Sequence, residues 1–299
     1  MQSICIGLIR RHDKGCHDGP SLAALALPQG EAQADAWERP GAGLSMKPSP
    51  WPLWVAHRGA GKLAPENTLA AFRLGAQHGY AAFECDVKLS ADGVPFLLHD
   101  ATLERTSNAQ GVAGDKPWSE LSRVDAGTWH SRAYAGEPLP TLDNIAAFCH
   151  ASDHALNIEI KPTPGTDRRT GEVVAREAER LWAGRATPPL LSSFQADALE
   201  GARTAAPQLP RALLIDSLYD GWFDLAQRLG CVAVVANYKL YSAEMVARLH
   251  AANLWALCYT VNDESSARAL LVMGLDGLIT DAVDRFSPQG GRSARRLGV

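Results

Sequence analysis

The stretch AFECDVKLSADGVPFLLHD, residues 82–100, combines an apolar run, a turn and a second apolar run. Side chains of a strand point to the same face at every second residue, so a strand over 82–87 places Glu84 and Asp86 together. Cys85 then points to the opposite face, into a packing layer. Two carboxylates on one face repel each other unless a cation or a basic partner lies between them. This pattern favours a functional site over the alternative, in which one carboxylate faces solvent at a frayed strand end.

The turn inside this stretch predicts a hairpin. The letters SADG at 90–93 are a turn signal between two apolar runs. Segment 94–99 is therefore expected to fold back antiparallel on the preceding strand. Counting from the turn places His99 beside Glu84, within one residue of register. The hairpin would bring a histidine to the two carboxylates.

Outside the hairpin, strand-like runs alternate with helical patterns up to Phe286. The expected strands cover residues 53–57, 82–87, 155–160, 190–193, 211–215, 232–236, 255–260 and 277–280. The expected helices cover residues 68–78, 171–181, 197–205, 222–229, 242–252 and 265–273. Eight strands with intervening helices predict an α/β fold of the (β/α)8 type, a TIM barrel, better than an open sheet. No internal repeat is visible.

Functional side chains of such barrels gather at the carboxyl ends of the strands. The residues expected there are His57, Glu84, Asp86, Glu159, Lys161, Phe194 and Tyr259. Carboxylates are ligands for hard cations, histidines transfer protons near neutral pH, and arginine and lysine provide positive charge for a phosphate. Together these groups favour a metal-assisted phosphodiesterase.

Each motif also has a purely structural interpretation. His57 could be a satisfied polar residue at a strand end, and Glu159 with Lys161 could form a local ion pair. In the helix start PENT we favour a structural role for Glu66, whereas Asn67 is a candidate for both roles. The ordered combination of motifs is specific because these separate interpretations would all have to hold at once.

Domain boundaries follow from composition. Residues 1–50 carry repeated Gly and Pro without periodicity, and we expect a disordered extension, with Met46 as a candidate start. The barrel is expected over 51–286, followed by a polar tail at 287–299. Segment 101–142 is too long and polar for a plain loop and is interpreted as an inserted subdomain or a lid over the barrel mouth.

Charge and composition exclude some classes of partner. The formal net charge of −4 over 299 residues provides no basic field, so nucleic acid is not an expected partner. No apolar run has the length of a membrane span, so membrane insertion is not expected either. The cysteines form no CxxC pair, which predicts free thiols in a reducing compartment, the cytoplasm. They are Cys5, Cys16, Cys85, Cys149, Cys231 and Cys258.

Several segments together resemble one known family. HRGAGKLAPENTLAAF, FECDVKLSADGVPFLLHDATLERTSNAQG and NIEIKP, followed by LLSSF, YTVN and GLITDAVD, are similar to the glycerophosphodiester phosphodiesterases, most of all to bacterial cytosolic members. The resemblance extends from Trp51 to Phe286. It implies a (β/α)8 barrel with an inserted segment after the HD motif. It also implies hydrolysis of glycerophosphodiesters to glycerol 3-phosphate and an alcohol.

The resemblance also implies residue roles and a cofactor. His57 and His99 correspond to an acid/base pair, in which the assignment of acid and base stays open. Arg58 and Lys161 correspond to phosphate contacts, with Phe194 and Tyr259 near the substrate. Glu84, Asp86 and Glu159 correspond to the ligands of one divalent cation. A set made only of carboxylates suits Mg²⁺ or Ca²⁺ better than zinc, and the resemblance favours Mg²⁺.

Three alternatives stay open at this point. A metal amidohydrolase usually needs an early His-x-His pair, where this chain has His57-Arg58. A non-catalytic binding barrel is a known fate of enzyme folds. A phospholipase-type substrate would need an apolar rim or an anchor, which the sequence does not clearly provide. The preferred headgroup and the oligomeric state are not determined by the sequence.

Overall fold

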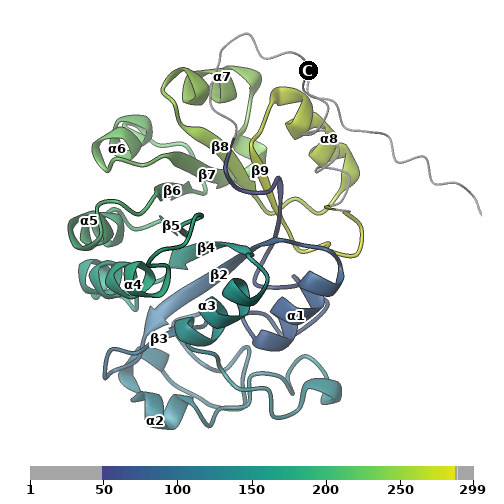
Figure 1. Ribbon diagram of the computed structural model, residues 1–299, viewed down its shortest axis with the longest axis vertical. Coiled ribbons are helices and arrows are strands. Elements are labelled where there is room, and N and C mark those ends of the chain that lie inside the picture. Colours follow the sequence, from purple (N-terminus) through teal and green to yellow (C-terminus); the bar gives the residue numbers. More distant parts are fainter. Residues whose placement is uncertain (1–48, 287, 289–299) are drawn as a thin grey trace, which may run out of the picture. The chain divides into compact units, whose positions relative to one another are not determined.

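The barrel predicted from the sequence is present. The structure, a computed structural model, describes residues 49–286 and residue 288. Eight parallel strands form a ring in which each strand pairs with its neighbours, and the pairing of Ala56 with Phe83 closes it (Figure 1). They are β1 (Trp54–Ala56), β2 (Ala82–Leu89), β4 (Ala155–Ile160), β5 (Leu190–Ser193), β6 (Arg211–Ile215), β7 (Ala233–Asn237), β8 (Trp255–Tyr259) and β9 (Gly277–Thr280).

Helices alternate with these strands and surround the ring in Figure 1. Six of them overlap the predicted helices: α1 (Leu69–Gln77), α4 (Asp167–Leu181), α5 (Ala196–Ala205), α6 (Trp222–Arg228), α7 (Ala243–Ala251) and α8 (Glu264–Met273). A seventh, α3 (Leu142–Ala151), was not predicted. Its start is fixed by a capping box in which Thr141 and Asn144 satisfy each other's backbone amides.

Alternation along the strands produces two apolar layers. One layer fills the interior of the barrel and includes Val55, Leu214 and Ile279. Trp51 belongs to this interior layer and packs edge-on against Trp255, with ring centroids 5.2 Å apart. The other layer lies between strands and helices and contains Cys85, which confirms that this thiol points away from the neighbouring carboxylates.

The hairpin forms because β2 is longer than its neighbour β1. β2 has eight residues and β1 has three, so the end of β2 extends past β1 and is free to pair on that edge. β3 (Pro95–Leu97) occupies it antiparallel, with Leu97 opposite Val87. Continuing this register places His99 opposite Cys85, one residue from the predicted Glu84 and within the stated margin.

The inserted segment forms a small subdomain beside β3. It contains η1 (Ala113–Asp115), α2 (Trp118–Leu121) and η2 (Arg132–Tyr134), and α2 lies near β3 in Figure 1. Its apolar side chains make a separate cluster that includes Phe96, Leu98 and others from the segment itself. The segment is therefore stabilised by an apolar cluster that it shares with Phe96 and Leu98.

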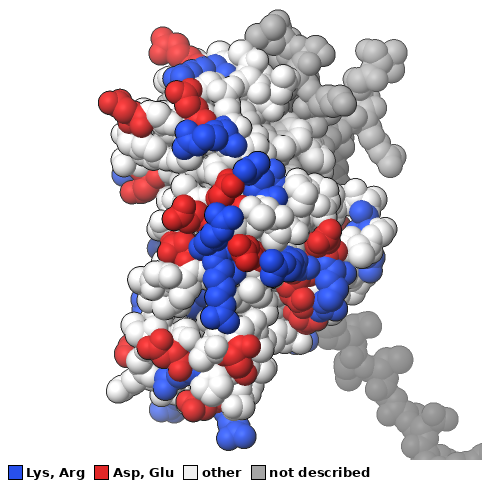
Figure 2. Space-filling model, turned by 90° about the vertical axis from the view of Figure 1, so that its left-hand side faces the viewer, with Lys and Arg blue, Asp and Glu red and all other residues white. Residues whose placement is uncertain are grey.

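The surface formed by α4, α5 and α6 carries interspersed charges of both signs. Figure 2 shows lysines and arginines next to acidic side chains across this face. Pairs such as Arg180 with Glu177 and Arg203 with Glu200 account for part of the pattern. Mixed charge of this kind provides no continuous basic surface on the face shown.

Two further findings concern the ends and the helices. None of the helices among the described residues is long and apolar enough to span a lipid bilayer. Residues 1–48 of the predicted extension, which include the start at Met46, and most of the polar tail lie outside the residues that the structure describes. Ser49, before the predicted boundary of the barrel, is already buried.

Candidate active site

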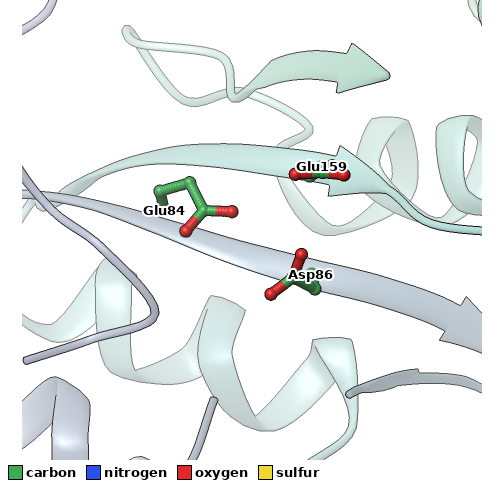
Figure 3. A group of neighbouring side chains, drawn as sticks. All are labelled: Glu84, Asp86 and Glu159. Atoms are coloured by element: carbon green, nitrogen blue, oxygen red, sulfur yellow. The ribbon is translucent and has the colours of Figure 1, made fainter. Parts of the chain in front are cut away.

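Three buried carboxylates, two from the middle of β2 and one from the end of β4, converge inside the barrel. Glu84, Asp86 and Glu159 each offer an oxygen, and these atoms lie within 4.8 Å of one another (Figure 3). Asp86 pairs with Glu159 in the register between the two strands, which is why the side chains meet. The separate interpretation of Glu84 or Asp86 as a frayed, solvent-facing residue is wrong, because both are almost completely buried.

Burial and neighbouring charges shift the pKa values of the three carboxyls in different directions. Burial and the neighbouring charges of Asp86 and Glu159 raise the pKa of Glu84 well above its usual range. Burial and Asp86 also raise the pKa of Glu159 to about 7. Burial alone would raise the pKa of Asp86 too, but the positive charges of Arg58 and Lys161 outweigh it and lower that pKa. Asp86 is therefore the permanently charged member of the group.

The arrangement fits a hard divalent cation. Glu84 Oε1 and Asp86 Oδ1 are buried and accept no hydrogen bond within the described part of the chain. Buried carboxylate oxygens without donors are costly unless a positive charge compensates them. An all-oxygen donor set is the one that Mg²⁺ and Ca²⁺ prefer. These residues could hold such an ion.

Two cationic side chains border the carboxylates. The Arg58 guanidinium lies 3.3 Å from Asp86, and its backbone amide donates to Glu84 at 3.0 Å. Lys161 lies 2.8 Å from Glu159 and 3.4 Å from Asp86. Burial would lower the pKa of Lys161, but Asp86 and Glu159 raise it, so the amine stays protonated. The interpretation of Glu159 and Lys161 as only a local pair is incomplete, since Lys161 reaches two further groups.

Both predicted histidines lie at the same cavity, and each has a carboxylate behind it. His57 Nδ1 lies 2.6 Å from Asp281 Oδ1, and His57 Nε2 lies 3.7 Å from Glu84. His99 Nδ1 lies 2.7 Å from Asp100 Oδ1. An ionised carboxylate accepts, so each Nδ1 carries the proton, and each Nε2 is directed elsewhere. A carboxylate that fixes the tautomer and orientation of a histidine is the arrangement that proton-transfer sites use.

His99 is additionally held from two sides. Lys161 Nζ donates to His99 Nε2 at 2.8 Å. Lys88, buried on β2, donates to the backbone oxygens of His99 at 3.2 Å and Lys161 at 3.4 Å. Burial lowers the pKa of Lys88 to about 8, and it also lowers the pKa of His99. The unprotonated imidazole is thus the favoured state of His99.

The PENT segment contributes more than a helix start. Thr68, not Glu66, caps α1 through its side chain. Glu66 instead forms ion pairs with Arg58 at 2.9 Å and Arg105 at 2.8 Å, so its interpretation as a simple helix-terminal residue is wrong. Asn67 donates to Asp86 at 2.8 Å and accepts from its backbone amide, which links this loop to the carboxylate group.

Arg105 connects the inserted segment to the site. It binds Glu66 on one side and Asp100 on the other, with a 2.6 Å contact from Nε to Asp100. The hydrogen bond from Arg105 and the contact with His99 lower the pKa of Asp100 to about 2. The orienting carboxylate of His99 is consequently ionised and fixed.

A cavity of about 230 Å³ lies over these groups. It is lined by His57, Arg58, Glu84, His99, Asn157, Glu159, Lys161, Phe194, Leu214, Asp216, Tyr259, Thr260 and Ile279. Phe194 and Tyr259, both predicted as substrate contacts, are among them. None of the lining residues belongs to the inserted segment 101–142.

Four polar residues at the site were missed as functional candidates. Asp281 and Asp100 stand behind the histidines, Asn262 donates to Asp281 at 3.1 Å, and Asp216 faces the cavity. Asp100 directly follows His99, and Asp281 and Asp216 each follow the last residue of a strand. Their position at the carboxyl ends was a signal that could have found them.

The comparisons with known proteins agree with this site. A model of the glycerophosphoryl diester phosphodiesterase family matches residues 57–285. The chain is 30% identical over 236 residues to a glycerophosphodiester phosphodiesterase of Caldanaerobacter subterraneus, covering 77% of this chain and 93% of the relative. It is 51% identical over 257 residues to a glycerophosphoinositol inositolphosphodiesterase of the mouse, covering 78% of this chain and 46% of the relative.

A solved structure extends the likeness to three dimensions. An Oleispira antarctica phosphodiesterase in complex with the product sn-glycerol-3-phosphate superposes with a TM-score of 0.73 at 32% identity. The alignment covers 82% of this chain and 97% of that one. The family match includes both histidines and all three carboxylates of the cavity. This chain belongs to the glycerophosphoryl diester phosphodiesterase family.

Proposed function

We propose that this protein is a divalent-cation-dependent enzyme that hydrolyses glycerophosphodiesters to glycerol 3-phosphate and an alcohol. The observation that carries the proposal is the convergence of two carboxylate-oriented histidines on a cavity that also contains three buried carboxylates. Phosphodiester hydrolysis needs proton transfer on both sides of phosphorus and compensation of phosphoryl charge. This site can supply both.

The cation would be held by Glu84, Asp86 and Glu159, with Mg²⁺ favoured over Ca²⁺. The proposal is supported by the two carboxylate oxygens without hydrogen-bond donors and by the all-oxygen donor set. When bound, a divalent cation neutralises phosphoryl oxygens and lowers the pKa of a nearby hydroxyl. Protonation of Glu159, whose pKa is raised to about 7, would compete with cation binding in acid.

His57 and His99 would carry the protons. The nucleophile is the substrate's own glycerol 2-hydroxyl, so the first half forms a cyclic phosphate and releases the alcohol. One histidine takes the hydroxyl proton and the other protonates the departing oxygen; water then opens the cyclic phosphate with the roles reversed. The unprotonated state of His99, whose pKa burial lowers, supports its assignment as the first base. Lys161, which donates to Nε2, would turn to the phosphoryl oxygens so that Nε2 can accept the proton.

Arg58 and Lys161 would contact the phosphoryl oxygens. Both side chains lie beside the carboxylates and line the cavity. A planar guanidinium and a point-charge ammonium, fixed before the reaction, stabilise negative charge that develops in the transition state. Asn67 would keep the Asp86 carboxylate in place while these charges rearrange.

The expected partners are small glycerophosphodiesters, with neither nucleic acid nor membrane insertion. The mixed charges of Figure 2 and the size of the cavity support this part of the proposal. We also propose a cytoplasmic location. It is supported by the free thiols of the four described cysteines, Cys85, Cys149, Cys231 and Cys258.

The test is a panel of glycerophosphodiesters assayed after chelation, with divalent cations added back one at a time. We expect no turnover in chelator, restoration by Mg²⁺, and glycerol 3-phosphate as the phosphorylated product. Release of an acyl-bearing product from lysophospholipids alone would indicate the phospholipase-type alternative. Binding of diesters without any turnover in all cations would indicate a non-catalytic barrel.

A further inference from the structure

We propose that the part of the cavity wall at the carboxyl ends of β5, β6 and β8 is a subsite for a cationic headgroup, such as choline or ethanolamine, with Asp216 as its specificity-determining residue. This inference rests on the proposed function, which does not assign a headgroup. Its other members are the aromatic rings of Phe194 and Tyr259, which line the same cavity.

The topology of the barrel separates this wall from the reacting groups. The acidic group lies on β2 and β4, whereas Asp216 follows β6, and Asn237 and Tyr259 end β7 and β8. In the ring order β1, β2, β4, β5, β6, β7, β8, β9, strand β6 lies three places from β2 and two from β4, and β8 lies four places from β4. A substrate whose phosphate reaches the acidic group can therefore extend one arm toward Asp216.

The charge of Asp216 is not compensated by a cationic side chain. Its Oδ1 accepts from Asn237 at 3.0 Å and from the Tyr259 hydroxyl at 3.1 Å, and both donors are neutral. None of the ion pairs within residues 49–286 includes Asp216, and its Oδ2 accepts no hydrogen bond there. The two neutral donors fix the direction of the carboxylate while its negative charge stays available to the cavity.

Two aromatic rings form a corner next to this carboxylate. Phe194 and Tyr259 meet edge to face, with centroids 5.8 Å apart and planes at 90°. Phe194 remains 37% exposed, and Lys161 Nζ already lies 5.8 Å from the centre of its ring. An aromatic face attracts ammonium groups, and quaternary ammonium ligands are bound by such rings in other proteins.

The remaining wall is mixed in character. Leu214 and Ile279 line the cavity without a hydrogen-bonding side chain, whereas Asn157 and Thr260 line it with one. The methyl or methylene groups of choline and ethanolamine suit apolar and aromatic neighbours, and one carboxylate matches their single charge.

The experiment compares kcat/KM for four diesters: glycerophosphocholine, glycerophosphoethanolamine, glycerophosphoglycerol and glycerophosphoinositol. In Asp216→Asn the ratio of the choline to the glycerol diester should fall roughly 3- to 10-fold, as expected for one partly exposed charge contact. Phe194→Leu should lower the same ratio. The matched control is Asp220→Asn, an exposed residue outside the cavity, which should leave the ratio unchanged.

A measurement on the wild-type protein avoids any dependence on folding of the variants. Added salt should weaken its preference for choline over glycerol as a headgroup, because the contact is electrostatic and partly exposed. An equal loss for all four diesters in Asp216→Asn, or a salt-independent preference, would overturn the subsite while leaving diester hydrolysis intact. A selective loss for the inositol diester would assign the wall to a polyol. Absence of turnover with every diester would overturn the proposed function and this inference together.

Discussion

The two histidines of the cavity are positioned by different parts of the molecule. His57 follows β1 and its partner Asp281 follows β9, two strands that pair directly in the closed ring. His99 and Asp100 follow β3, which is attached to the ring only through the end of β2. The side chain of His57 is 15% exposed, whereas that of His99 is 28% exposed.

The difference shows that a histidine can be positioned either by backbone pairing or by ion pairs between side chains. Closing the barrel is sufficient to bring His57 and Asp281 together, because backbone pairing sets both positions. His99 depends in addition on a sequence of ion pairs through Asp100 and Arg105, and Arg105 is 44% exposed. Exposed ion pairs are weakened by salt, whereas backbone pairing inside a barrel is not. We therefore expect His57 to be robust and His99 to be tunable.

The largest effect should come from the three carboxylates Glu84, Asp86 and Glu159 and the cation that they would bind. Chelation, or Glu84→Gln with Asp86 and Glu159 intact, should reduce turnover roughly 10³-fold or more, because the phosphoryl charge is then no longer compensated. The metal-free Glu84→Gln protein should nevertheless melt at a higher temperature, since one of three repelling carboxylates is removed. Turnover and melting temperature with and without cation are the measurements. Full activity in excess chelator would contradict the assignment.

The histidines themselves come next. His57→Ala and His99→Ala should each lower kcat roughly 10²–10⁴-fold with a smaller change in KM, because proton transfer is lost and binding is largely retained. A nitrophenyl leaving group needs little protonation and should rescue the variant that lacks the general acid. If His99 is the first base, the rescued variant is His57→Ala. Rescue of neither variant, or of both equally, would refute a division of roles.

Substitution of the carboxylates behind the histidines, Asp281 and Asp100, compares the barrel with the hairpin. Asp281→Asn and Asp100→Asn should each cost roughly 10- to 10²-fold in kcat, since an amide at this place permits the wrong tautomer. Asp281→Asn should have the larger effect. Both oxygens of Asp281 already accept hydrogen bonds inside the barrel, one from His57 and one from Asn262, so an amide nitrogen there would face a donor. The pH–rate profile is the decisive measurement, because a purely structural defect would lower the rate without shifting the apparent pKa values of the profile. Equal profiles in both variants and wild type would show that neither carboxylate acts through a histidine.

The same contrast explains what could be predicted from the sequence. The ring of strands and six of its helices were predicted because their periodicity is local. α3 was missed although Thr141 and Asn144 spell a capping box, because it begins where the predicted insertion 101–142 ends and no element was assigned between that insertion and the strand at 155–160. The shared face of Glu84 and Asp86 on β2 and of Glu159 and Lys161 on β4 followed from alternation. The pair of His57 and Asp281 spans 224 residues, and no local pattern encodes such a contact.

Glu66 shows a second limit of local interpretation. It stands at a helix start, where acidic residues are common for reasons of the helix dipole. Its real partners are Arg58, eight residues away, and Arg105, thirty-nine residues away in the inserted segment. Only the folded chain shows that this carboxylate joins the barrel to the subdomain.

A smaller effect should come from Arg105, the exposed connection. Arg105→Gln should lower kcat about 2- to 10-fold, because Asp100 loses its fixed position but remains beside His99. Added salt should lower the wild-type rate and change the variant less. Arg123→Gln, an exposed arginine of the same segment, is the matched control and should behave as wild type. An identical salt response in wild type and Arg105→Gln would show that the ion pairs do not position His99.

The smallest expected effect is a dependence of stability on pH, and its sign differs between the two parts. Glu159 has a folded-state pKa of about 7 against an ordinary value of 4.5, so between these values the folded barrel binds a proton that the unfolded chain lacks. The metal-free protein should therefore become more stable as pH falls through 7, by a few degrees of melting temperature. Asp100 has a folded-state pKa of about 2 against 3.8, so its contribution is lost as pH falls from about 4 toward 2.

Saturating Mg²⁺ provides the discriminating condition. A bound cation requires ionised carboxylates, so it should remove or reverse the gain between pH 7 and pH 5, while the loss below pH 4 persists. Thermal unfolding followed across pH, with and without Mg²⁺, measures both windows in one experiment. Glu159→Gln should reduce the upper window, because Glu84, whose pKa is also raised, still contributes to it, and Asp100→Asn should reduce the lower one. A metal-free protein that loses stability steadily from pH 7 downward would mean that the three carboxyls do not repel one another as their burial requires.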